Sequence, residues 1–83
     1  MNEVEQKVRR IVSRIVKVPE SRLGRDVDLR VDLNVDSLQG LQIVAALEKT
    51  FGLRVPDEDL DLYTTVGAIV DTVERLQARA RPS

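Results

Sequence analysis

The stretch that decides the fold runs from residue 31 to residue 52 and reads VDLNVDSLQGLQIVAALEKTFG. Asp36 has the short acidic side chain that caps a helix, and Gln39 three residues later completes a capping-box pattern. Gly52 is the residue type that most often ends a helix, because it adopts the left-handed conformation without strain. The stretch therefore predicts a helix that begins at Asp36 or Ser37 and ends at Phe51.

This predicted helix has two apolar faces. At about 100° per residue, the core face is formed by Ile43, Val44, Leu47 and Phe51. A second apolar stripe lies on nearly the opposite side and comprises Leu38, Leu41 and Ala45. A helix in a small bundle needs to bury only one stripe. The second stripe is either ordinary apolar surface or a docking patch for a partner, and the spacing leaves both readings open.

Two further long helices lie outside this stretch. An apolar stripe at helical spacing runs from Val4 to Ile15, and Pro19 ends it; a second stripe runs from Val66 to Leu76 behind a cap at Thr64 or Thr65. Pro56 opens a short third helix. The connection over residues 18–35 carries apolar residues that should lie on the core, namely Leu23, Val27, Leu29, Val31 and Leu33. The prediction is an all-α four-helix bundle with three main helices, one short third helix and a long first loop.

The composition describes one small domain spanning residues 1–83, with a core at about 4–77 and a frayed tail at 78–83. The 83 residues are 42% apolar and 33% charged. With no Cys and no His, the chain lacks thiolate zinc ligands, a Cys nucleophile and a Ser-His-Asp triad. Its acidic residues lack the spacing of an EF-hand, so no metal site is predicted.

Other partner classes are excluded by charge and hydropathy. A net charge of −1 and only two aromatic residues give no footprint for nucleic acid. The longest apolar run, residues 43–47, is far too short for a membrane span. The N-terminus has no secretory pattern, and the absence of Cys fits a cytoplasmic protein.

Ser37 is the one residue of chemical interest that these observations leave open. A catalytic serine needs an activating base, usually His, and the chain has none. Ser37 is therefore either a simple helix-start residue or a site that another protein modifies.

The run Asp36-Ser37-Leu38, inside residues 31–38, closely resembles the modification site of the acyl carrier proteins. The resemblance extends through residues 8–12, 43–48, 55–58 and 64–66, and so covers roughly residues 4–77. The combination of Asp-Ser-Leu, Pro-Asp-Glu and Thr-Thr-Val at family-like spacing is specific, whereas Asp-Ser-Leu alone is not.

The resemblance implies a carrier and not an enzyme. It implies that a phosphopantetheinyl transferase attaches 4′-phosphopantetheine from coenzyme A to Ser37, between Asp36 and Leu38. The arm's thiol then carries acyl groups as thioesters to acyl-transferring or condensing enzymes of fatty acid, polyketide or related specialised synthesis. A chain without cysteine would thus obtain its sulfur from a cofactor. We expect the chain to be a monomer.

The resemblance also assigns two surfaces. It implies a partner-docking surface made of Leu38, Leu41, Gln42, Ala45, Glu48, Asp57 and Glu58. It implies an acyl pocket lined by Ile43, Leu47, Phe51, Val55 and Tyr63, with Tyr63 in place of the usual aliphatic residue.

Some positions depart from the family pattern. Gln39, Gln42 and Lys49 stand on the second helix where acids are usual, which favours a specialised pathway. Asn34 replaces the glycine three residues before the serine, and Asn tolerates left-handed backbone angles. Two alternatives remain: an aminoacyl or peptidyl carrier, and an unmodified helical interaction module.

Overall fold

The computed structural model describes residues 2–56 and 64–80. In this part of the chain the regular structure is helical: α1 (Glu3–Val16), the short 3-10 helix η1 (Glu20–Arg22), α2 (Ser37–Phe51) and α3 (Val66–Ala80). The only β pairing among these residues is an isolated bridge between Asp28 and Thr65. The predicted all-α fold with three main helices and a long first loop is confirmed. The predicted short third helix after Pro56 falls outside the described residues.

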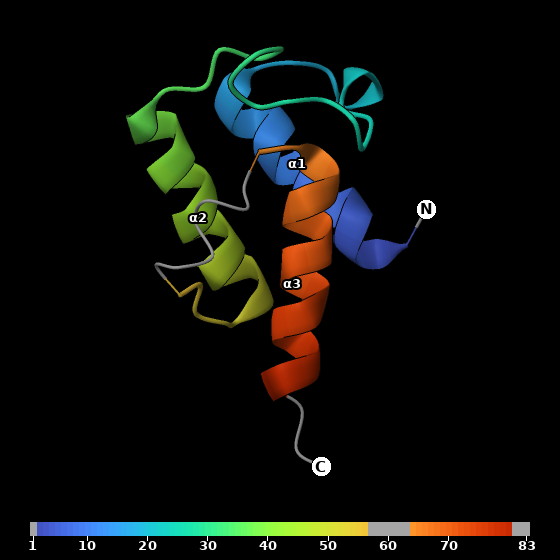
Figure 1. Cartoon of the computed structure of the whole chain (residues 1–83), viewed down its shortest axis with the longest axis vertical. Helices are drawn as coiled ribbons and strands as arrows, with labels where there is room; N and C mark the ends of the chain where they lie inside the picture. The colour runs from blue at the N-terminus through green and yellow to red at the C-terminus, as the bar shows by residue number, and fades with distance from the viewer. Residues whose placement is uncertain (1, 57–63, 81–83) are drawn as a thin grey trace.

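Helix α1 is the element on which the other two main helices pack. Its apolar stripe is buried at Val8, Ile11 and Val12, and it contacts both α2 and α3. Figure 1 shows α1 behind α3, with α2 alongside and the long loop crossing over the top of the bundle to reach the start of α2. The loop therefore decides where α2 begins.

Both ends of α2 follow the sequence signals. The Asp36 carboxylate accepts a hydrogen bond from the Gln39 N–H, and the Gln39 side chain accepts one from the Asp36 N–H. At the other end, Gly52 has φ 62° and ends the helix. At α3, Thr65 provides the cap, since its Oγ1 accepts from the Ala68 N–H at 3.1 Å. The prediction of a frayed tail from residue 78 is wrong for residues 78–80, because α3 continues to Ala80. Ala and Arg favour a helix, and the first residue that opposes one is Pro82.

The core joins the three helices to the loop. Its buried cluster comprises Val8, Ile11, Val12, Leu23, Leu29, Ile43, Leu47, Val66, Ile69, Val70 and Val73. Leu23 and Leu29 belong to the loop and are 0% and 4% exposed, so the prediction that the loop lies on the core is confirmed for them. Val31 is 82% exposed, so the same prediction is wrong there.

Backbone hydrogen bonds attach the loop to the start of α3. The Val66 N–H donates to the Val27 carbonyl at 3.0 Å, and the Gly67 N–H donates to the Arg25 carbonyl at 2.9 Å. In the other direction, the Leu29 N–H donates to the Thr64 carbonyl at 2.9 Å. The first N–H groups of a helix have no partner inside the helix, and here loop carbonyls provide one.

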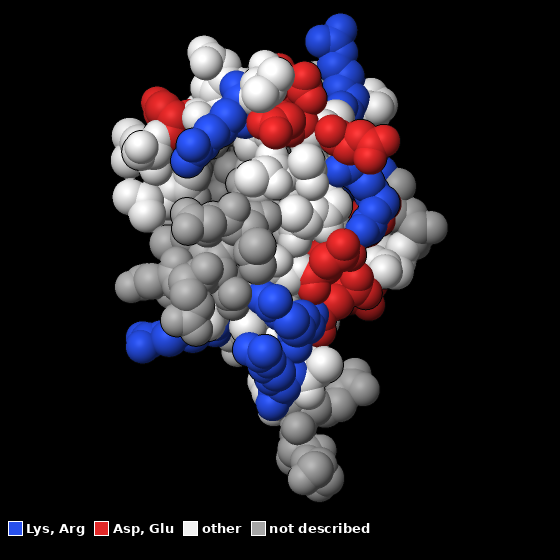
Figure 2. All heavy atoms as spheres, viewed as in Figure 1, with Lys and Arg blue, Asp and Glu red and all other residues white. Residues whose placement is uncertain are grey.

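Arg25 reinforces this attachment with its side chain. Its guanidinium lies 2.9 Å from a Glu5 carboxylate oxygen on α1 and 2.7 Å from an Asp71 oxygen on α3. Hydrogen bonds to Asp71, and to a lesser extent to Glu5, raise the pKa of the Arg25 guanidinium above its ordinary value. Such exposed pairs add little stability, so their main effect is to orient the loop. Figure 2 shows acidic and basic side chains interspersed toward the upper end of the molecule and basic ones gathered lower down.

None of the helices within residues 2–56 and 64–80 combines the length and hydropathy needed to cross a bilayer.

The two glycines inside α2 and α3 should respond oppositely to alanine. A Cβ at Gly40 would meet no atom of the part of the chain that the structure describes within 4 Å, whereas one at Gly67 would lie 3.1 Å from the Arg25 carbonyl oxygen. We expect Gly40→Ala to raise the free energy of unfolding by up to about 1 kcal/mol, because glycine is a poor helix former. We expect Gly67→Ala to lower it, because the overpacking cost of about 1–3 kcal/mol exceeds that gain. Urea unfolding of both variants checks this, and a stabilised Gly67→Ala variant would contradict the close packing of the loop on α3.

Candidate functional site

The residues just before α2 form a closed turn. One carboxylate oxygen of Asp28, Oδ1, accepts hydrogen bonds from the backbone N–H groups of Arg30 and Val31, each at 2.8 Å. The Asp28 N–H in turn donates to Asp32 Oδ2 at 2.8 Å. Side chains of this kind stabilise turns by bonding to the nearby backbone. The turn directs Val31 outward, which explains its exposure.

The turn is closed by the backbone and by one unusual residue. The Val35 N–H donates to the Leu29 carbonyl at 2.8 Å, and the Asn34 N–H donates to the Arg30 carbonyl at 3.1 Å. Asn34 has φ 55°, a left-handed angle that Asn tolerates, so the turn forms without the glycine usual in the family. The closure brings residues 29–30 next to residues 35–37, at the start of α2.

Ser37 is the first residue of α2, and its side chain has no role in the cap. Asp36 Oδ1 accepts from the Gln39 N–H at 2.8 Å, and Gln39 Oε1 accepts from the Asp36 N–H at 3.4 Å. No hydrogen bond joins the Ser37 hydroxyl to the described part of the chain, and the residue is exposed. The helix start is therefore stable without this hydroxyl, which is left for another function.

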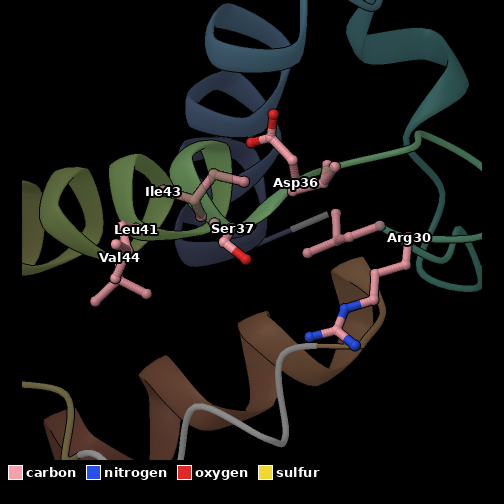
Figure 3. Close-up of a pocket in the computed structure, with 9 residues that line it drawn as sticks. Arg30, Asp36, Ser37, Leu41, Ile43 and Val44 are labelled. Carbon is pink, nitrogen blue, oxygen red and sulfur yellow. The ribbon is translucent and has the colours of Figure 1, made fainter.

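A pocket of about 580 Å³ adjoins Ser37. The described residues that line it are Leu29, Arg30, Val35, Asp36, Ser37, Gly40, Leu41, Ile43 and Val44. In Figure 3 the Ser37 hydroxyl and the Arg30 guanidinium turn into the same space, while the Asp36 carboxylate points away on the other side of the chain. The site thus has a hydroxyl, one cation and largely apolar walls.

Gly40 keeps this pocket open. It is the fourth residue of α2 and lines the pocket, yet a Cβ there would meet no atom of the described residues within 4 Å. No contact with residues 2–56 or 64–80 requires a glycine at this position, and glycine weakens the helix. The missing side chain leaves the helix backbone accessible from the pocket.

The predicted docking stripe lies on the surface. Leu38 is 65% exposed and Leu41 is 62% exposed, and Gln42 and Ala45 are exposed too. The loop therefore does not cover the second stripe of α2. Glu48 differs from the prediction of an exposed docking acid: it is half-buried, and its Oε2 accepts from the Val55 N–H at 2.8 Å. This bond holds the chain that follows α2.

Of the described residues predicted for an acyl pocket, only one lines the pocket next to Ser37. Ile43 lines the Ser37 pocket, whereas Leu47 and Val55 are buried and Phe51 is half-buried, and none of these three lines it. The Lys7 ammonium lies 5.9 Å from the centre of the Phe51 ring. Asp57, Glu58 and Tyr63 lie outside the described residues.

Sequence reasoning missed several lining residues, above all Leu29, Arg30 and Val35. They come from the loop, and the hydrogen bonds that close the turn, among them Leu29–Val35 and Arg30–Asn34, place them next to the start of α2. The clustering of side chains that a metal ion needs is not found in the described residues.

Comparisons with known proteins agree with this geometry. Residues 6–73 match the family model described as the phosphopantetheine attachment site. An acyl carrier protein from Enterococcus faecalis has a similar solved structure, with a TM-score of 0.77 and 35% sequence identity over 89% of this chain and 94% of that one. The chain therefore belongs to the acyl carrier protein family, and its cofactor is covalently attached 4′-phosphopantetheine. The exposed hydroxyl, the neighbouring guanidinium and the open position at Gly40 fit such a group.

Removing the Ser37 hydroxyl should leave the fold unchanged, whereas removing the cap should not. We expect the free energy of unfolding of Ser37→Ala to lie within about 0.5 kcal/mol of the wild-type value, because surface substitutions usually change it by no more than that. The free energy of unfolding of Asp36→Ala should be lower than that of the wild type by about 0.5–2 kcal/mol, because the Gln39 N–H loses its acceptor. Chemical denaturation of the two variants measures both values. Equal losses would mean that Ser37 takes part in the cap.

Proposed function

We propose that this chain carries acyl groups as thioesters on a 4′-phosphopantetheine arm attached to Ser37. The observation that carries the proposal is the Ser37 hydroxyl, which is exposed, unused by the helix cap and directed into a pocket. The first N–H groups of α2 and the helix dipole favour the phosphodiester that the attachment creates. When bound, the cofactor supplies the thiol that forms the thioester.

In the attachment step the chain acts as a substrate and not as a catalyst. The Ser37 oxygen forms a bond to the phosphorus next to pantetheine in coenzyme A, and the pyrophosphate P–O bond breaks. The leaving group is adenosine 3′,5′-bisphosphate. The hydroxyl proton passes to a base of the transferase, because this chain has no His and its Asp36 carboxylate points away and accepts from the Gln39 N–H.

The pocket next to Ser37 is also the proposed binding place for the arm once it is attached. Leu29, Val35 and Val44 supply apolar walls next to Ser37. We propose that the first part of the arm lies along these walls, which excludes water from it. Ile43 belongs to the same wall. Leu47, Phe51, Val55 and Tyr63 remain predicted residues of a shelter for the acyl chain.

The exposed stripe of α2 is the proposed docking surface. Leu38, Leu41 and Ala45, with Gln42 beside them, form an apolar surface that a partner enzyme would bury. The partners proposed are a phosphopantetheinyl transferase and the acyl-transferring or condensing enzymes of a fatty acid, polyketide or related specialised pathway. The carrier is proposed to act in the cytoplasm as a monomer, and Asp57 and Glu58 remain predicted docking residues.

Intact mass tests the attachment site. Wild type and Ser37→Ala are incubated with coenzyme A, magnesium and a broad-specificity phosphopantetheinyl transferase. We expect wild type to gain the mass of one phosphopantetheine and Ser37→Ala to gain nothing. A loaded Ser37→Ala variant, or an unmodified wild type beside another carrier that the same transferase loads, would contradict the proposal.

A charge placed on the docking stripe should impair partner recognition without affecting the fold. We expect Leu41→Glu to slow transferase loading roughly tenfold, as loss of a central apolar contact does at interfaces. The control is Thr50→Glu, an exposed position near the other end of α2. Both variants should melt near the wild-type temperature, because Leu41 is 62% exposed. Equal loading of both variants would show that partners do not use this stripe.

A further inference from the structure

Arg30 has a backbone position fixed by the turn. Its N–H donates to Asp28 Oδ1 at 2.8 Å, and its carbonyl accepts from the Asn34 N–H at 3.1 Å. The same turn is closed across it by the Leu29–Val35 hydrogen bond. The turn therefore brings Arg30 to the same pocket as Ser37, although six residues lie between them in the sequence.

The acids around Arg30 already serve the backbone. Asp28 accepts from two loop N–H groups, Asp32 accepts from the Asp28 N–H, and Asp36 caps α2. Within residues 2–56 and 64–80, no ion pair joins the Arg30 guanidinium to an acid. Arg25, by contrast, pairs with both Glu5 and Asp71. Arg30 is thus a cation that turns into the pocket instead of toward the carboxylates of its own turn.

A phosphodiester on Ser37 would add a negative charge to a segment that already holds three carboxylates. Among the described residues that line the pocket, Arg30 is the cation. A guanidinium binds phosphate oxygens through two parallel N–H donors, a geometry that a lysine ammonium lacks. Its position on the Ser37 side, opposite the Asp36 carboxylate, places it where such a group would be attached.

We propose that Arg30 binds the phosphodiester of the arm on Ser37 and thereby holds the start of the arm against the pocket. The inference rests on the proposed function, because it requires the arm to be attached to Ser37. Arg30 is then a positioning residue: it offsets the charge of the turn and directs the arm toward Leu41 and Val44.

The test compares the unmodified and modified protein by NMR after mass spectrometry has confirmed one arm on Ser37. We expect the Arg30 Nε–H signal to shift and to exchange more slowly with water once the arm is attached. The Arg22 Nε–H signal should not change, because Arg22 is an exposed loop arginine outside the pocket lining. The ³¹P signal of the modified protein should move in Arg30→Gln and stay in Arg22→Gln.

Three results would overturn the inference. Unchanged Arg30 signals, with a ³¹P signal that is the same in Arg30→Gln and wild type, would show that the guanidinium does not bind the phosphodiester. A response that appears only when the thiol carries a malonyl group would assign Arg30 to a cargo carboxylate instead. Absence of any arm on wild-type Ser37 would overturn the proposed function and this inference with it, and the mass measurement identifies that case beforehand.

Discussion

The structure depends on the hydrogen bonds by which the long loop is attached to the start of α3. The Val66 and Gly67 N–H groups would lack partners at the head of a helix, and the carbonyls of Val27 and Arg25 accept from them. Burial of Leu23 and Leu29 holds the same segment on the core. A loop of this length costs conformational entropy to order, and these contacts offset that cost. They fix the point from which the closed turn leads into α2.

In the turn and the helix cap, aspartate side chains form the hydrogen bonds that stabilise the backbone around the site. Asp28, Asp32 and Asp36 bind backbone N–H groups, so the local fold does not depend on Ser37. The hydroxyl remains exposed at the edge of the pocket. This arrangement suits a residue that must change chemically without unfolding the domain.

Much of this could be predicted because the signals are local. The capping box at Asp36 and Gln39, the end at Gly52 and the left-handed Asn34 each depend on residues a few positions apart. The exposed stripe of α2 followed from helical spacing. Motif resemblance singled out Ser37, which local chemistry alone left between two readings.

What the sequence did not predict depends on contacts across the loop. Nothing in the spacing of Leu29 and Val35 indicates that they are hydrogen-bonded, so the place of Arg30 beside Ser37 and the exposure of Val31 could not be foreseen. The resemblance implied Glu48 as a docking residue, yet its carboxylate accepts from the Val55 N–H. The extent of α3 was underestimated because its apolar stripe ends before its helix-favouring residues do.

Amide hydrogen exchange of the unmodified protein tests most directly whether the loop holds the site in place before any arm is attached. The informative amides are those of Val35, Val66 and Gly67, which donate to loop carbonyls. We expect these amides to exchange as slowly as buried amides of α1, because both sets become accessible only when the core unfolds. Exchange at the rate of an unprotected coil, with α1 still protected, would contradict it and would show that the site forms only after modification or partner binding.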